Sequence, residues 1–142
     1  ERLNKKNIGA KLFFFDEERV VMEFIDGVHL NDFLKGCEDI KKIKKVLKEV
    51  LRQCRILDLM KVNKYEMHRI TKNVIVRKNF PVLIDFERCK VVEEPKNVSQ
   101  FCTFLMKTSF FDVVFGDVVK IVREYKKDFS DKCFKGVENL FF

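Results

Sequence analysis

The 142-residue sequence has few glycines, no closely paired cysteines and no long apolar run, and each absence excludes a class of protein. The five glycines form no G-x-G-x-x-G, so no glycine-rich phosphate loop is present. The five cysteines are widely spaced and include no C-x-x-C, so neither a zinc site nor a redox pair is indicated. Charged residues interrupt every apolar run well before the ~20 residues of a membrane span, so no membrane partner is expected.

The composition that remains is that of one ordinary globular domain. Apolar residues make up 46% of the chain and charged residues 36%, which suits a chain with a real core rather than a disordered one. Most of the cysteines lie in apolar patterns, so we expect buried free thiols and a cytoplasmic location. The chain begins at Glu1 in the middle of a pattern, and we therefore expect it to be a piece of a longer polypeptide.

The net charge of +7 raises the question of nucleic-acid binding, and the distribution of the lysines bears on it. The densest lysine block, 41–48, lies within a segment whose apolar residues recur at the three-and-four spacing of a helix. The lysines then form the solvated face of an amphipathic helix. No aromatic residue is interleaved with them to stack bases, so a dedicated RNA-binding strip is the weaker interpretation.

The apolar pattern predicts an α+β chain. Segments 8–15 and 19–25 are rich in β-branched and aromatic residues and flank a polar Asp16-Glu17-Glu18 turn, which indicates a β-hairpin. Segments 74–76 and 82–84 predict a second pair of strands, whereas 61–72 has no period and is expected to be irregular. The expected helices are 29–34 ended by Gly36, 38–60, one from an Asn97 or Ser99 cap to about 108, 112–127 and 130–140.

The strongest motif is Val-Leu-Ile-Asp-Phe-Glu at 82–87. An apolar strand that ends in an isolated aspartate places the Asp85 carboxylate at the strand tip, where it can hold a hard cation. The segment resembles the metal-binding motif of protein kinases in the form found in RIO-like, choline-kinase-like and aminoglycoside-phosphotransferase-like members. The resemblance implies that Asp85 holds a magnesium ion that bridges the phosphates of ATP.

Two further segments resemble kinase elements. Val-Met-Glu-Phe-Ile-Asp-Gly at 21–27 is similar to the hinge between the lobes, which implies that Met22 is the gatekeeper and that the backbones of Glu23 and Ile25 bind adenine. The segment 64–73 lies where the catalytic loop should be.

In that loop the kinase pattern is altered. His68-Arg69 imitates a His-Arg-Asp motif, but Ile70 follows in place of the aspartate. The alignment that keeps the kinase spacing to the metal motif puts Glu66 in the position of the catalytic base, and it resembles a group of archaeal kinase-like proteins. This alignment implies that Arg69 and Lys72 bind phosphate and that Asn73 binds the metal ion.

Together these resemblances imply a protein-kinase-like fold: a mostly helical C-terminal lobe at 26–142, with a remnant of the small lobe at 1–25. The expected function is that of a RIO-like atypical serine/threonine protein kinase that transfers phosphate from Mg-ATP to a Ser/Thr or another acceptor. The chain alone is expected to be inactive, since Lys11 lies too close to the hinge to be the phosphate-pairing lysine.

Two alternatives remain open. Glutamate in the base position favours a pseudokinase that acts as a binding module, and the Ile-Asp-Phe-Glu motif also suits a small-molecule phosphotransferase of the choline or aminoglycoside type. The segment after Asp85 is short, which disfavours an ordinary peptide substrate. A protein or ribonucleoprotein partner is possible, and the apolar hairpin is expected to cause self-association.

Overall fold

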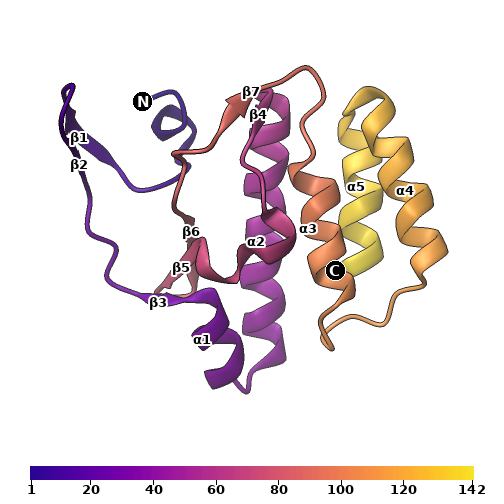
Figure 1. Cartoon of the computed structure of the whole chain (residues 1–142). Helices are drawn as coiled ribbons and strands as arrows, with labels where there is room; N and C mark the ends of the chain where they lie inside the picture. Colours follow the sequence, from indigo (N-terminus) through magenta and orange to yellow (C-terminus); the bar gives the residue numbers. More distant parts are fainter.

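The computed structural model describes residues 1–142 as an α+β fold, as the sequence predicts. About half of the residues lie in helices, and the strands form three small antiparallel sheets rather than one large one. The long helix α2 runs through the middle of the molecule, with the sheets on one side and three helices on the other (Figure 1). None of the helices is both long enough and apolar enough to traverse a bilayer.

The predicted N-terminal hairpin is confirmed. Strands β1 (Leu12–Phe15) and β2 (Val20–Met22) pair antiparallel, and Asp16 closes the turn by accepting hydrogen bonds from the backbone N–H groups of Glu18 and Arg19. A 3-10 turn, η1 (Asn4–Lys6), precedes the hairpin. These two strands form a sheet of their own, which stands apart from the helices (Figure 1).

The second predicted hairpin is also confirmed and lies in a three-stranded sheet. Strands β5 (Val74–Arg77) and β6 (Phe80–Leu83) pair antiparallel, and the short strand β3 (Val28–His29) adds to the other edge of β5. Helix α1 (Leu30–Gly36) follows β3 directly, as expected. The chain that leaves the first hairpin is therefore attached to the second one through the pairing of β3 with β5.

Helix α2 (Ile40–Leu59) is the amphipathic helix that the spacing predicts. Asp39 caps it by accepting hydrogen bonds from two backbone N–H groups of the first turn, and one apolar stripe is fully buried while most of the lysines face outward. The buried members of the stripe are Ile43, Val46, Leu47, Val50, Leu51, Cys54 and Leu57.

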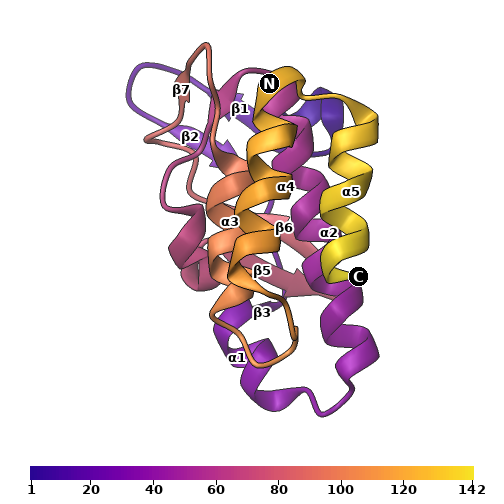
Figure 2. The ribbon, with the colours of Figure 1, turned by 90° about the vertical axis from the view of Figure 1, so that its right-hand side faces the viewer.

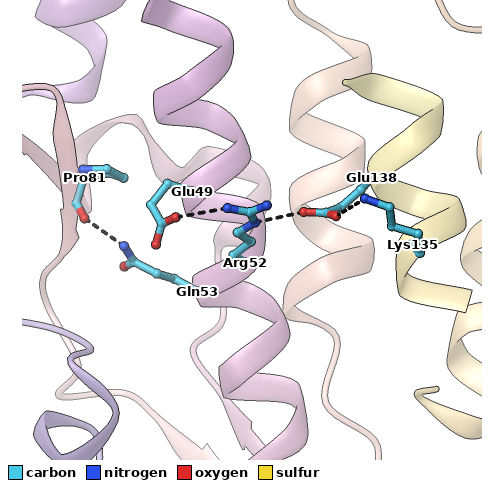
Figure 3. A network of polar contacts seen from close by, with 6 residues as sticks. All are labelled: Glu49, Arg52, Gln53, Pro81, Lys135 and Glu138. Carbon is cyan, nitrogen blue, oxygen red and sulfur yellow. Dashed lines mark hydrogen bonds and ion pairs between the residues drawn. The ribbon is translucent and has the colours of Figure 1, made fainter. Parts of the chain in front are cut away.

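Polar side chains of α2 reach both neighbouring layers (Figure 3). On one side, Gln53 Nε2 donates to the carbonyl oxygen of Pro81 in β6 at 2.8 Å. On the other side, Arg52 Nε donates to Glu138 Oε1 at 2.9 Å, and Glu138 also contacts Lys135 in the last helix. Helix α2 therefore joins the sheet to the helical layer.

The stretch 61–72, expected to be irregular, contains two short ordered elements. Strand β4 (Val62–Asn63) pairs antiparallel with β7 (Lys90–Val91), and a 3-10 segment, η2 (Met67–Lys72), follows. The pairing with β7 is non-local, and a two-residue strand carries no readable period, which is why the sequence pattern did not indicate it.

The helical layer consists of α3 (Asn97–Met106), α4 (Phe115–Asp128) and α5 (Asp131–Phe141), which lie side by side in both views (Figures 1 and 2). The predicted caps of α3 are wrong, because its N-cap position is Lys96, which makes no side-chain cap. The start of α4 at 112 is also wrong. Phe111, just before it, packs edge-on against Phe141 and Phe142, and Val114 is extended.

Gly27 is the position where the hinge segment approaches the sheet most closely. A Cβ atom at Gly27 would lie 2.5 Å from the carbonyl oxygen of Val76, which is shorter than any real contact. Gly27→Ala must displace β3 from β5, so we predict a loss of about 1–3 kcal/mol of unfolding free energy in denaturant titration.

Gly36 provides the matched control. It ends α1, has an ordinary φ, and a Cβ there would meet no atom within 4 Å. Gly36→Ala should be neutral or stabilise the fold by about 0.5–1 kcal/mol. Equal effects of the two substitutions would contradict the packing described for Gly27.

The hairpin exposes apolar side chains on both of its faces. Phe13, Phe14 and Phe15 are 60%, 50% and 57% exposed. We predict that the chain self-associates through this hairpin, because exposed apolar strands with free edges pair with other chains. Sedimentation velocity should show a weight-average mass that rises with concentration, and Phe15→Asp should reduce that rise.

A control for general loss of apolar surface is Phe115→Asp, since Phe115 is 70% exposed at the start of α4. It should leave the association unchanged. A chain that stays monomeric at every concentration would contradict the prediction.

Candidate functional site

Two cavities meet at Asp85. The first has a volume of about 470 Å³ and is mostly apolar, and it lies between the N-terminal segment with its hairpin and the segment 84–87. Its size is within the usual range for small-molecule sites. The lining residues are Leu3, Asn4, Ile8, Gly9, Ala10, Leu12, Val20, Met22, Ile84, Asp85, Phe86 and Glu87.

The second cavity, here called the polar cavity, has a volume of about 590 Å³ and is lined by polar and charged residues with one exception. It is formed by the loop after β4, the segment between β6 and β7, and one residue of α3. Asp85 lines both cavities, so a molecule that occupied both would pass this carboxylate. The lining residues are Lys64, Tyr65, Glu66, His68, Asn73, Asp85, Arg88, Lys90 and Gln100.

The pairing of β5 with β6 brings Asn73 and Asp85 to the same end of that hairpin. Val74 lies opposite Leu83, and just beyond this pair the Ile84 N–H donates to the Asn73 carbonyl oxygen at 2.9 Å. Asp85 follows at once, with a φ of 61°. Both predicted metal-binding residues therefore line the polar cavity, although they are 12 positions apart in the sequence.

These two residues offer a metal ion one carboxylate and one amide oxygen. Oxygen ligands suit Mg²⁺, which binds proteins through one or two carboxylates and takes its other ligands from phosphates and water. No group of three or more His, Cys, Asp or Glu side chains gathers anywhere in the chain. The donor set fits a Mg²⁺ ion that arrives with a phosphorylated ligand, and it does not fit an independent metal centre.

Glu66, the predicted catalytic base, also lines the polar cavity and is exposed. Tyr65 and Glu66 both have left-handed backbone conformations, with φ of 46° and 55°. Such conformations cost free energy for residues with a Cβ, and they tend to persist at functional sites. The turn is held by hydrogen bonds from Arg69 N–H to the Glu66 carbonyl and from Met67 N–H to Gln100 Oε1.

Lys64 is the buried cation of the site. It is 3% exposed, its Nζ donates to the Asp85 carbonyl oxygen at 2.7 Å, and the ammonium lies 5.0 Å from the centre of the Phe86 ring. Burial lowers the pKa of the Lys64 ammonium from its usual value, while nearby acidic groups oppose that effect. Lys64 thus fixes the main chain of Asp85 and, through it, the position of the Asp85 carboxylate.

The three hinge residues have different positions. The Met22 side chain lines the apolar cavity, whereas the Ile25 side chain is buried and neither Glu23 nor Ile25 lines that cavity. Among the loop backbone hydrogen bonds, none uses the Glu23 carbonyl or the Ile25 N–H. The Glu23 carboxylate pairs with Arg77, whose hydrogen bond lowers the pKa of Glu23.

Arg69 and Lys72, predicted to bind phosphate, line neither cavity. The 3-10 turn η2 directs Met67 and Ile70 fully into the core, so Arg69 and Lys72 fall on its outer side and are exposed. The sequence predicted only an irregular stretch here, and the 3-10 turn decides which of its residues face the site.

The loop of the site is braced from below by a buried polar network. Asp58 Oδ1, at the end of α2, accepts hydrogen bonds from both the backbone N–H and Nδ2 of Asn97, at 3.0 and 2.7 Å. Asn97 Nδ2 also donates to the Val62 carbonyl, and its Oδ1 accepts from the Lys64 N–H at 2.8 Å. Asp58 Oδ2 accepts from the Tyr125 hydroxyl at 2.9 Å. Asn97 thus does not cap its own helix; it positions the start of the loop.

Several residues of the site were not predicted. Lys64, Arg88, Lys90 and Gln100 line the polar cavity. The first three stand in segments without apolar periodicity, and Gln100 lies in the expected helix that starts near Asn97. The one available signal was position: a lysine at the start of the loop 64–73, and basic residues three and five positions after Asp85.

No protein-family model matches the chain, and no curated protein matches it either.

The network makes Asn97 the most sensitive polar residue outside the cavities. Asn97→Ala would remove the side-chain hydrogen bonds of Asn97 to the Val62 carbonyl and the Lys64 N–H, and one of the hydrogen bonds to the buried Asp58 carboxylate. We predict a loss of about 3 kcal/mol of unfolding free energy.

Ser99→Ala is the control in the same helix, because the Ser99 hydroxyl makes only an exposed hydrogen bond to the Lys96 carbonyl. It should change the unfolding free energy by no more than about 0.5 kcal/mol. If Asn97→Ala unfolds at the same denaturant concentration as Ser99→Ala, the network does not brace the loop.

Proposed function

We propose that the chain is the larger lobe, with part of the smaller lobe, of a RIO-like atypical protein kinase that binds Mg-ATP and transfers a phosphoryl group to a hydroxyl. The observation that carries this proposal is the convergence of Asp85, Asn73 and Glu66 on a polar cavity that shares Asp85 with an apolar one. An apolar cavity suits a flat heterocycle, and a polar one with oxygen ligands suits phosphates and their cation.

In this proposal each residue has one task. Met22 and the other apolar residues of the first cavity enclose the adenine, whereas Glu23 and Ile25 do not line this cavity and are given no contact with the adenine. Asp85 and Asn73 hold Mg²⁺, which would supply charge neutralisation between the phosphates when bound. Glu66 accepts or orients the proton of the attacking hydroxyl. Lys64 fixes the backbone of Asp85.

A pseudokinase that acts as a binding module is the second candidate. It is favoured by the glutamate at position 66, where the kinase pattern has an aspartate. A small-molecule phosphotransferase is the third, and it is favoured by the short segment between Asp85 and α3, which leaves little platform for a peptide.

Asp85→Ala tests the proposal directly. Mg-ATP should bind this chain weakly, because the phosphate grip of a glycine-rich loop and its lysine is missing, so chemical shifts in an NMR titration are the suitable readout. We predict that Mg²⁺ strengthens ATP binding to the native chain and that Asp85→Ala removes this dependence on Mg²⁺. The change in affinity should be about tenfold, which corresponds to ~1.4 kcal/mol.

Asp112→Ala is a matched control, since Asp112 is an exposed aspartate that lines neither cavity. It should leave the Mg²⁺ dependence intact. If Asp85→Ala behaves in the same way as Asp112→Ala, Asp85 is only a turn residue. If the native chain binds no nucleotide, the binding-module alternative is favoured.

A further inference from the structure

The polar cavity contains more positive charge than the proposed phosphoryl transfer uses. Its basic side chains are Lys64, His68, Arg88 and Lys90, and its carboxylates are Glu66 and Asp85. The two carboxylates are assigned to the hydroxyl proton and the metal, and the Lys64 ammonium is bonded to the Asp85 carbonyl. Arg88 and Lys90 have no such task.

Neither Arg88 nor Lys90 has an acidic partner. None of the ion pairs of the chain includes either residue, although nearby Lys61 is paired with Glu93. Both side chains are exposed and both line the cavity. Unpaired cations beside a cavity raise the local concentration of anionic ligands.

The backbone holds these two residues in place. Lys90 lies opposite Asn63 in the pairing of β4 with β7, and Asn63 is itself buried and accepts a hydrogen bond from the Lys96 N–H. Arg88 is in the turn that the Cys89 N–H closes onto the Phe86 carbonyl at 3.1 Å. The two cations are therefore attached to the same short segment that carries Asp85.

We infer that the phosphoryl acceptor is a small hydroxyl compound that already carries a phosphate group, which Arg88 and Lys90 bind in the polar cavity. This inference rests on the phosphoryl transfer of the proposed function, and it assigns the accepting hydroxyl to a small phosphorylated compound rather than to a protein side chain. The guanidinium of Arg88 suits two oxygens of one phosphate, and the Lys90 ammonium adds a point charge. A cationic acceptor such as an amino sugar or choline would be repelled by the same two residues.

The transfer itself balances without any further reactant. The acceptor hydroxyl oxygen forms a bond to the γ-phosphorus of ATP, and the bond from that phosphorus to the β,γ-bridging oxygen breaks. ADP leaves with the electron pair of the broken bond. The hydroxyl proton passes to the Glu66 carboxylate and then to water.

Binding of glycerol 3-phosphate tests the inference, and glycerol, which has the same carbon chain without the phosphate, is the neutral comparison. The native chain should bind glycerol 3-phosphate and not glycerol in an NMR titration. Arg88→Gln with Lys90→Gln should weaken that binding at least about tenfold, because it removes both charges on the phosphate. The affinity for Mg-ATP should change less than about twofold.

The matched control removes two charges elsewhere. Lys127→Gln with Lys132→Gln changes two exposed lysines of α4 and α5 that line neither cavity and form no ion pair. It should leave glycerol 3-phosphate binding unchanged. Equal weakening by both double variants would mean that only the net charge acts, and it would overturn the inference.

Two other results would also overturn it, and they are distinguishable. If glycerol 3-phosphate competes with Mg-ATP and the Arg88/Lys90 variant loses both ligands, these cations hold the phosphates of the donor; the proposed function then stands and the acceptor assignment fails. If glycerol 3-phosphate binds through Arg88 and Lys90 but no nucleotide binds, the proposed function fails, and the acceptor assignment fails with it.

Discussion

The architecture of this protein depends on one buried carboxylate. Asp58 lies in the last turn of α2. Its two carboxylate oxygens accept hydrogen bonds from the backbone N–H groups of Asn97 and Val98 at the start of α3, from the Asn97 side chain, and from the Tyr125 hydroxyl in α4. Burial raises the pKa of the Asp58 carboxyl, which measures the cost of keeping a charge there, and the donors offset that cost. Because Asn97 also holds the backbone of Val62 and Lys64, the order of the site loop follows from the order of this network.

The site is built on three separate supports that meet at one segment. The β5–β6 hairpin fixes the position of Asp85 just after β6, and the Lys64 ammonium donates to the Asp85 carbonyl. The pairing of β4 with β7 holds the chain that follows Asp85 beside the loop. Left-handed conformations at Tyr65, Glu66 and Asp85 are concentrated here. Strain of this kind persists only where surrounding contacts over-determine the backbone, which the three supports do.

Elements with a local signal could be predicted from the sequence, and elements that depend on distant partners could not. Both hairpins and the stripe of α2 follow from the apolar period, and the placement of Glu66, Asn73 and Asp85 in one site was expected from the resemblance of their segments to kinase motifs. The burial of Lys64 could not be predicted, because its partner is a carbonyl 21 positions away. The positions of Arg69 and Lys72 outside both cavities could not be predicted either, because the 3-10 turn that places them is fixed by the burial of Met67 and Ile70.

The isolation of the β1–β2 sheet has a consequence for how the molecule opens. Ile8, Leu3 and the close approach of Gly9 to Phe86 join the N-terminal part to the core, whereas the Asn4 side chain bonds only to the N-terminal part itself, so we expect this part to be a unit of low local stability. Its amides should exchange with solvent far faster than those of α2. The apolar cavity lies between this unit and the segment 84–87, so whatever occupies it binds only the closed population. A ligand in this cavity would therefore stabilise the N-terminal part in its packed position, and binding and local stability would rise together.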